Sequence, residues 1–304
     1  MATSLLASSM RGVLADDTTT SHRKFTVDLR ASSIGVSADL DTTIQLAAKH
    51  GFESVGADPY AIGNMAESQI SDLKQRLKDA GLVWGSAGLP IQFREDEKRF
   101  RDDLSKLPVR AAALRVAGVT RMGTWIMPCH ATLPYRDNFL LHAKRLRQCA
   151  KILNDHGIRF GIEYVGTKTL RDSKRYAFIS SMAEARQLNE AIAVENMGLI
   201  MDSWHWYTAG ETAQHLKTLS NQEIVACDLN DAPADRTIDT QVDNQRELPA
   251  ATGVIDVKTF LAGLSAVGYD GPIRAEPFNT KLNAMDNDAA CAATCKALFS
   301  AVNA

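Results

Sequence analysis

The segment DNFLLHAKRLRQCAKILNDHGIRFGIE, residues 137–163, contains the unit from which the fold is built. Between residues 137 and 156 the apolar side chains recur at spacings of four and three, which is typical of a helix with one buried stripe, here Phe139, Ala143, Leu146, Ala150 and Leu153. Gly157 follows, where a left-handed residue commonly ends a helix. The β-prone run 158–163 comes next. The segment therefore predicts a helix that leads directly into a strand.

The same order of helix, glycine and strand recurs along the chain. A glycine precedes the next β-prone run in KHGFE (49–53), DAGLV (79–83) and AVGYD (266–270). The segment 256–267 predicts another amphipathic helix, with Asp256 at the position of an N-cap. The runs expected to form strands are 25–30, 52–57, 82–87, 121–127, 158–163, 197–202, 223–228 and 272–277.

Eight strands that alternate with helices predict an α/β protein with a single (β/α)8 TIM barrel domain over residues 24–304. A doubly wound sheet usually has fewer strands and a phosphate loop, and none of the motifs G-x-G-x-x-G, G-x-x-x-x-G-K-[ST] and G-x-S-x-G appears. Residues 1–23 are rich in Ser, Thr and Ala, and we expect a disordered tail there. The alternative is the remnant of an export signal, since Val13-Leu14-Ala15 resembles a cleavage site.

Composition excludes several classes of function. The formal net charge is −2, from 34 basic and 36 acidic residues, so no global basic field attracts nucleic acid or an anionic membrane. No uncharged apolar run approaches the roughly 18 residues of a spanning helix. We therefore expect a cytoplasmic protein without membrane or nucleic-acid partners, export by the amino-terminal segment being the alternative.

Four consecutive predicted strands, the fifth to the eighth, each end in a carboxylate. These residues are Glu163, Asp202, Asp228 and Glu276. Because barrel active sites are built at the carboxyl ends of strands, we expect the four side chains to converge. Bare carboxylates so close together raise each other's pKa, and a divalent cation is the simplest neutraliser; oxygen ligands suit Mg²⁺ or Mn²⁺. For any one of them, a helix cap or a solvated loop residue is the alternative.

Further polar and aromatic groups are expected at the same rim. His205 lies three residues after Asp202, and the stretch 232–253, which has little secondary-structure signal, contains Arg246. Long loops in compact domains are usually functional. The residues that we expect to contact a substrate are His205, Arg246, Lys168, Trp204 and Asn230.

Four segments in this order resemble the signature segments of the xylose isomerase-like TIM barrel superfamily. They are GIEYVG (161–166), MDSWHWY (201–207), VACDLNDAP (225–233) and RAEPFN (274–279). That superfamily includes sugar phosphate isomerases and epimerases, ketose 3-epimerases, inosose dehydratases and endonuclease IV. The resemblance covers about residues 25–300.

The resemblance implies one divalent metal, Mn²⁺ in the first place with Mg²⁺ or Co²⁺ as alternatives, held by Glu163, Asp202, the residue at 228 and Glu276. It also implies that His205 and Arg246 contact the substrate. The family segment typically reads V-H-x-N-D, whereas Asp228 stands here at the position of the histidine ligand. An anionic, shorter ligand favours harder ions.

The resemblance further implies a sugar isomerase or epimerase that acts on a ketose or keto-inositol through an enediolate. Glu163 and Glu276 would be the catalytic pair, one removing and the other returning a proton. Loss of a β-hydroxyl from the same intermediate would make the protein a dehydratase of the inosose type.

Two other interpretations of the sequence compete with a sugar isomerase or epimerase. Asp228 makes a non-catalytic or metal-deficient sugar-binding barrel the main alternative. An abasic-site endonuclease would need a histidine-rich site, and among the four segments only His205 is a histidine. The identity of the sugar, its phosphorylation and a homo-oligomeric state are left open by the sequence.

Overall fold

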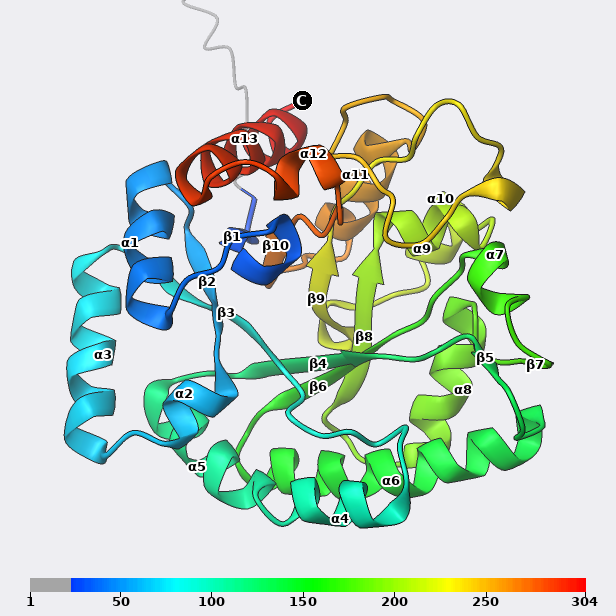
Figure 1. Ribbon diagram of the computed structural model, residues 1–304, viewed down its shortest axis with the longest axis horizontal. Coiled ribbons are helices and arrows are strands. Elements are labelled where there is room, and N and C mark those ends of the chain that lie inside the picture. The colour runs from blue at the N-terminus through cyan, green and yellow to red at the C-terminus, as the bar shows by residue number, and fades with distance from the viewer. Residues whose placement is uncertain (1–22) are drawn as a thin grey trace, which may run out of the picture.

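Eight parallel strands pair in chain order and close into a barrel (Figure 1). The structure is a computed structural model and describes residues 23–304. The barrel strands are β1 (Thr26–Leu29), β2 (Ser54–Ala57), β3 (Val83–Gly88), β4 (Arg121–Trp125), β6 (Arg159–Glu163), β8 (Met197–Asp202), β9 (Ile224–Asp228) and β10 (Pro272–Arg274). Each predicted strand overlaps one of them, so the predicted (β/α)8 barrel is confirmed.

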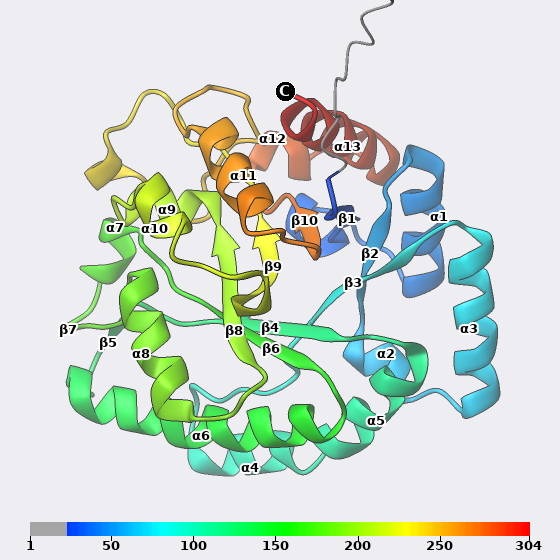
Figure 2. The same ribbon diagram turned by 180° about the vertical axis from the view of Figure 1, so that it is seen from behind.

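Helices cover the outside of the barrel in both views (Figures 1 and 2). A short antiparallel pair, β5 (Cys129–His130) and β7 (Tyr176–Ala177), lies outside the closed sheet. The α-helices are α1 (Leu40–His50), α2 (Pro59–Gly63), α3 (Glu67–Asp79), α4 (Glu97–Leu104), α5 (Leu107–Ala117), α6 (Tyr135–Asp155), α7 (Lys168–Arg171), α8 (Met182–Ile192), α9 (Ser203–Thr208), α10 (Ala213–Leu216), α11 (Val257–Ala266), α12 (Thr280–Asn283) and α13 (Asn287–Val302). The 3-10 turns are η1 (Ala31–Ile34), η2 (Asn221–Glu223) and η3 (Ile238–Thr240).

The helix predicted over 137–156 is α6, and its stripe packs against the barrel as expected. Phe139 is half-buried, and the other members, Ala143, Leu146, Ala150 and Leu153, are buried. Gly157 has a φ of +67°, a left-handed conformation that glycine adopts without strain. The side chain of Asp256 accepts a hydrogen bond from the backbone N–H of Thr259 at 2.9 Å, which confirms the predicted cap of α11.

The strand ends place three of the four predicted carboxylates directly at the barrel mouth. Glu163, Asp202 and Asp228 are the last residues of β6, β8 and β9. The eighth strand is shorter than predicted and ends at Arg274, so Glu276 lies in the following loop. Its backbone N–H donates to the side chain of Asn230 at 2.9 Å, and Pro277 has no N–H to continue the ladder.

The stretch 232–253 is irregular apart from η3, as predicted. The Asp231 carboxylate organises it, because it accepts hydrogen bonds from four backbone N–H groups, those of Ala232, Thr252, Gly253 and Ile255. Asp231 also pairs in an isolated bridge with Glu247. These contacts hold the loop against the end of β9 and fix the position of Arg246 within it.

The predicted segment 1–23 lies outside the described residues, except for Arg23. The guanidinium of Arg23 pairs with the carboxylate of Glu53 at 2.6 Å. Within residues 23–304, no helix has both the length and the apolar character that crossing a bilayer requires.

Candidate active site

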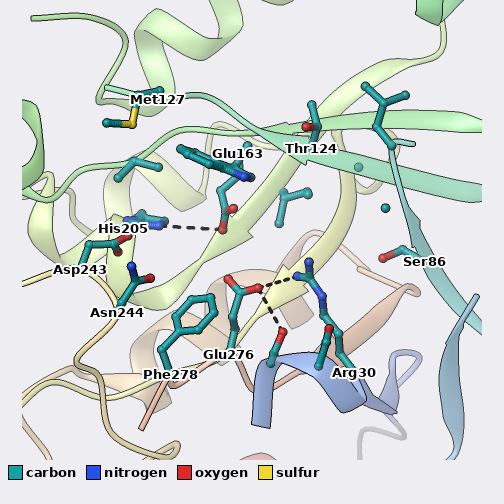
Figure 3. Close-up of a pocket in the computed structure, with 18 of the residues that line it drawn as sticks. Arg30, Ser86, Thr124, Met127, Glu163, His205, Asp243, Asn244, Glu276 and Phe278 are labelled. Atoms are coloured by element: carbon teal, nitrogen blue, oxygen red, sulfur yellow. Dashed lines mark hydrogen bonds and ion pairs between the residues drawn. The ribbon is translucent and has the colours of Figure 1, made fainter. Parts of the chain in front are cut away.

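A cavity of about 730 Å³ opens at the carboxyl ends of the barrel strands (Figure 3). Active sites of this architecture lie at the same end. The charged and imidazole side chains that line the cavity are Arg30, Arg94, Glu163, His205, Asp243, Arg246, Arg274 and Glu276. Four arginines and three carboxylates therefore share one enclosed space.

Glu163 is a buried carboxyl group without a partner for one of its oxygens. Among the described residues, none forms a hydrogen bond with its Oε1. Burial raises the pKa of Glu163 well above its ordinary value, and the charges of Glu276, Asp228 and Asp202 raise it further. This carboxyl group therefore favours a proton or a nearby cation.

Glu276, in contrast to Glu163, has a positively charged neighbour for each of its carboxylate oxygens. Its Oε1 accepts hydrogen bonds from Nη1 of Arg30 at 2.6 Å and from the hydroxyl of Ser33 at 3.2 Å (Figure 3). Its Oε2 lies 3.5 Å from Nη1 of Arg246. Two guanidinium groups thus contact this carboxylate.

The predicted convergence of the carboxylates is present as two overlapping groups. Glu163, Asp228 and Glu276 each bring one oxygen within 4.8 Å of the others, and Glu163, Asp202 and His205 do the same with their ligand atoms. Glu163 belongs to both groups. All five residues are buried.

Asp202 is held by two neighbouring segments. Its Oδ1 accepts from the backbone N–H of Trp204 at 2.8 Å and from Nδ2 of Asn230 at 3.0 Å, while its Oδ2 accepts from Nη1 of Arg246 at 2.8 Å. Burial raises the pKa of Asp202 to about 7, although Arg246 opposes the shift. The contact with Trp204 also caps α9, so the strand passes directly into the helix that carries His205.

Asp228 forms a two-pronged ion pair with Arg274. Nε of Arg274 donates to Oδ1 at 2.6 Å, and Nη2 donates to Oδ2 at 3.0 Å. Burial alone would raise the pKa of Asp228, but the charge and hydrogen bonds of Arg274 lower it below its ordinary value. The positive charge beside the Asp228 carboxylate is therefore the guanidinium of Arg274 on the neighbouring strand.

The register of the barrel explains this pairing. Asp202 lies beside Asp228, Asp228 beside Arg274, and Arg274 beside Asp28 on β1, so four adjacent strands carry one charged layer (Asp202, Asp228, Arg274 and Asp28). All four side chains are buried. Burial raises the pKa of Asp28 to about 6, and Arg274 is the strongest influence that lowers it. An aspartate is tolerated at 228 because the arginine lies between it and Asp28.

His205 projects from α9 toward the carboxylates. Its Nδ1 accepts from the backbone N–H of Gly166 at 3.3 Å, and its Nε2 lies 4.0 Å from Glu163 Oε1 and 3.2 Å from Nη2 of Arg246 (Figure 3). Burial lowers the pKa of His205 to about 3, and the Arg246 charge lowers it too. The imidazole is therefore neutral.

Arg246 reaches the cavity as the sequence predicts, and it bridges several acidic groups. Besides Asp202 and Glu276, it donates from Nη2 to Oδ1 of Asp243 at 2.8 Å. Its guanidinium carbon lies 5.1 Å from the ring centroid of Phe278.

Three residues predicted to contact a substrate, Lys168, Trp204 and Asn230, do not line the cavity. Lys168 pairs with Asp239 at 2.6 Å on the surface, and Trp204 is fully buried, with Nε1 bonded to Thr167. Asn230 is also buried, and its amide connects Asp202 to the backbone of Glu276. Asn230 therefore positions two carboxylates, and none of the three side chains lines the cavity.

Several residues of the cavity escaped the sequence analysis. Arg30 and Arg94 have no motif signal, whereas Arg274 stands inside a predicted buried strand, and a buried charge there could have signalled a partner. Trp125 is 43% exposed and lines the cavity. It is the last residue of β4, so its ring lies at the barrel mouth.

The ligand atoms of the two overlapping groups, Glu163 with Asp228 and Glu276 and Glu163 with Asp202 and His205, fit a divalent cation. Carboxylate oxygens and a neutral imidazole are suitable ligands, and Glu163 Oε1 is buried without a hydrogen-bond partner among the described residues. Asp228 can still act as a ligand while it is paired with Arg274, because each of its carboxylate oxygens accepts one hydrogen bond and has two lone pairs.

Comparison with known proteins agrees with this architecture. The model of the xylose isomerase-like TIM barrel family matches residues 44–298. Inosose isomerase from Bacillus velezensis is 20% identical over 244 residues, which are 79% of this chain and 84% of that protein.

Two solved structures have the same fold. A xylose isomerase domain protein from Alicyclobacillus acidocaldarius has a TM-score of 0.79 at 29% identity, over 89% of this chain and 96% of that one. The IolI protein with a bound zinc atom has a TM-score of 0.75 at 17% identity, over 92% and 98%. The matched region spans most of the barrel and all four quoted segments, and the chain therefore belongs to the xylose isomerase-like TIM barrel family.

Proposed function

We propose that this protein is a carbohydrate isomerase or epimerase that moves the proton on the carbon next to the carbonyl of a ketose or keto-inositol. The observation that carries the proposal is the pair Glu163 and Glu276, two carboxyl groups in one cavity with opposite surroundings. The similarity to inosose isomerase supports a cyclic or open-chain sugar ketone as the substrate.

The two glutamates divide the acid and base roles. Glu276, whose Oε1 accepts a hydrogen bond from Arg30, takes the proton from carbon and leaves an enediolate. Glu163, whose pKa is raised by burial, returns a proton. Return to the opposite face of the same carbon inverts the centre, and return to the neighbouring carbon gives the isomer.

A divalent metal would be held by Glu163, Asp228 and Glu276, with Asp202 and His205 beside them. When bound, such an ion supplies polarisation of the substrate carbonyl. Each glutamate has two oxygens, so one can face the ion while the other handles the proton. We propose Mn²⁺, which suits carboxylate ligands, with Mg²⁺ and Co²⁺ as alternatives.

Solvent exchange tests the proposed function directly. The protein is incubated in D₂O with ketoses and keto-inositols, with and without Mn²⁺, Mg²⁺, Co²⁺ or Zn²⁺, and products are followed by NMR. We expect deuterium at the carbon beside the carbonyl together with an epimer or isomer. Loss of water from the sugar would instead identify a dehydratase. Sugar binding without exchange under any metal would identify a non-catalytic barrel.

His205 is assigned to the substrate rather than to the metal. Replacing it by alanine removes one hydrogen bond to a sugar oxygen, so KM should rise roughly tenfold. The metal content, measured by elemental analysis, should stay unchanged. His215→Ala, at an exposed position outside the cavity, serves as the control. Loss of one metal equivalent in His205→Ala would show that the imidazole is a ligand.

A further inference from the structure

Arg94 differs from the other arginines of the cavity. Arg30, Arg246 and Arg274 each have a carboxylate oxygen within 2.8 Å. Within residues 23–304, Arg94 has no carboxylate oxygen within 4.0 Å, although it lines the same cavity. Among the described residues, every other guanidinium of the cavity is paired directly with a carboxylate, whereas Arg94 is influenced only by the more distant charge of Glu163, which opposes the lowering of its pKa by burial.

The Arg94 side chain is held in place by aromatic rings. Its guanidinium carbon lies 4.3 Å from the ring centroid of Phe93 and 4.1 Å from that of Trp125. Nη2 donates to the carbonyl oxygen of Trp125 and to the hydroxyl of Thr124, while Nε is buried without an acceptor among the described residues. Stacking thus fixes the plane of the group and leaves donors unused.

A fixed and unpaired guanidinium is suited to an anion. Its planar fork of N–H donors matches the oxygens of a carboxylate or a phosphate. Burial lowers the pKa of Arg94 to about 10, so the group stays charged at neutral pH. The half-exposed ring of Trp125 adds an apolar face beside it, and a cavity of about 730 Å³ has room for a substituted sugar.

We propose that Arg94, Thr124 and Trp125 form a subsite for an anionic substituent of the sugar, a carboxylate or a phosphate ester. This inference rests on the proposed function, because it names the class of sugar that the cavity accepts. Arg94 binds the anion, and the ring of Trp125 lies against the carbon chain next to it. The carbonyl end of the sugar then faces Glu163 and Glu276.

A matched series of sugars tests the subsite: a neutral ketose, the keto-uronic acid with the same carbon chain, and the corresponding phosphate ester. We expect the wild type to prefer one of the two anionic sugars, and which one it prefers identifies the substituent. Arg94→Met should lower kcat/KM for that sugar roughly 10- to 100-fold and leave the neutral ketose within about twofold. Arg94→Lys should recover part of the loss, since the charge remains but the fork does not.

Arg110→Met is the control, because Arg110 also stacks on an aromatic ring, that of Tyr60, but does not line the cavity. Thermal unfolding verifies that each variant is folded. Calorimetric binding of the same sugars separates this inference from the proposed function, since it requires no turnover. Binding of the anionic sugar that weakens in Arg94→Met alone supports the subsite even in a non-catalytic barrel. Equal losses for neutral and anionic sugars, or a wild type that does not distinguish them, would overturn it.

Discussion

Glu276→Gln is expected to lower turnover by a factor of about 10² to 10⁴, the usual contribution of a positioned acid–base group. The amide oxygen of glutamine can still accept the hydrogen bonds from Arg30 and Ser33 that hold the side chain. It cannot accept the substrate proton. We therefore expect a protein that is still folded, as thermal unfolding verifies, but that shows almost no deuterium exchange into the sugar.

Glu247→Gln is the matched control for this variant. Glu247 lies in the long stretch 232–253 and accepts a hydrogen bond from Asn279 at 2.9 Å, but it does not line the cavity. Its replacement should leave kcat unchanged within about twofold. Full turnover in Glu276→Gln would refute the assignment of this residue to proton transfer.

Arg274→Met is expected to destabilise the fold by about 3–5 kcal/mol, the range for a buried ion pair that loses one partner. The methionine fills much of the space but leaves Asp228 and Asp28 buried beside a missing cation. Urea unfolding at neutral pH measures the change. The free energy of unfolding should fall while the slope with urea concentration stays constant.

The double variant Asp228→Asn, Arg274→Met separates charge from packing. It removes the Asp228 carboxylate, which accepts both hydrogen bonds from Arg274 in the wild type, and should recover most of the lost stability. Asp28 remains, but its pKa of about 6 already shows that this group takes up a proton readily. A single variant as stable as the wild type would show that the ion pair is not needed for the barrel.

The barrel itself was predictable from local pattern. Helical stripes such as that of α6, and glycines such as Gly157, reflect forces that act within a few residues of one another. Three carboxylates were also predictable, since Glu163, Asp202 and Asp228 end their strands and barrel geometry brings strand ends together.

The partners of those carboxylates were not predictable in the same way. The contact between Arg274 and Asp228 depends on the register between β10 and β9, and that between Arg30 and Glu276 joins residues from opposite ends of the chain. Lys168 shows the converse error, because its position after Glu163 suggested the cavity while the backbone turns its ammonium group toward Asp239. Sequence proximity to a site residue does not determine the direction of a side chain.

The charged layer inside the barrel also bears on how the chain closes during folding. In a strand, a slip of one residue sends every side chain to the other face. If β10 slipped against its neighbours, Arg274 would point toward the outer helices, and Asp228 and Asp28 would remain inside without a cation. An all-aliphatic layer would lose little in such a slip, whereas this layer makes the misaligned barrel costly. β1 and β10 come from the two ends of the fold, and their pairing closes the barrel. Arg274 therefore favours the correct register of this closing strand pair. Correct closure is therefore the alignment in which Asp228 and Asp28 both lie beside the buried arginine.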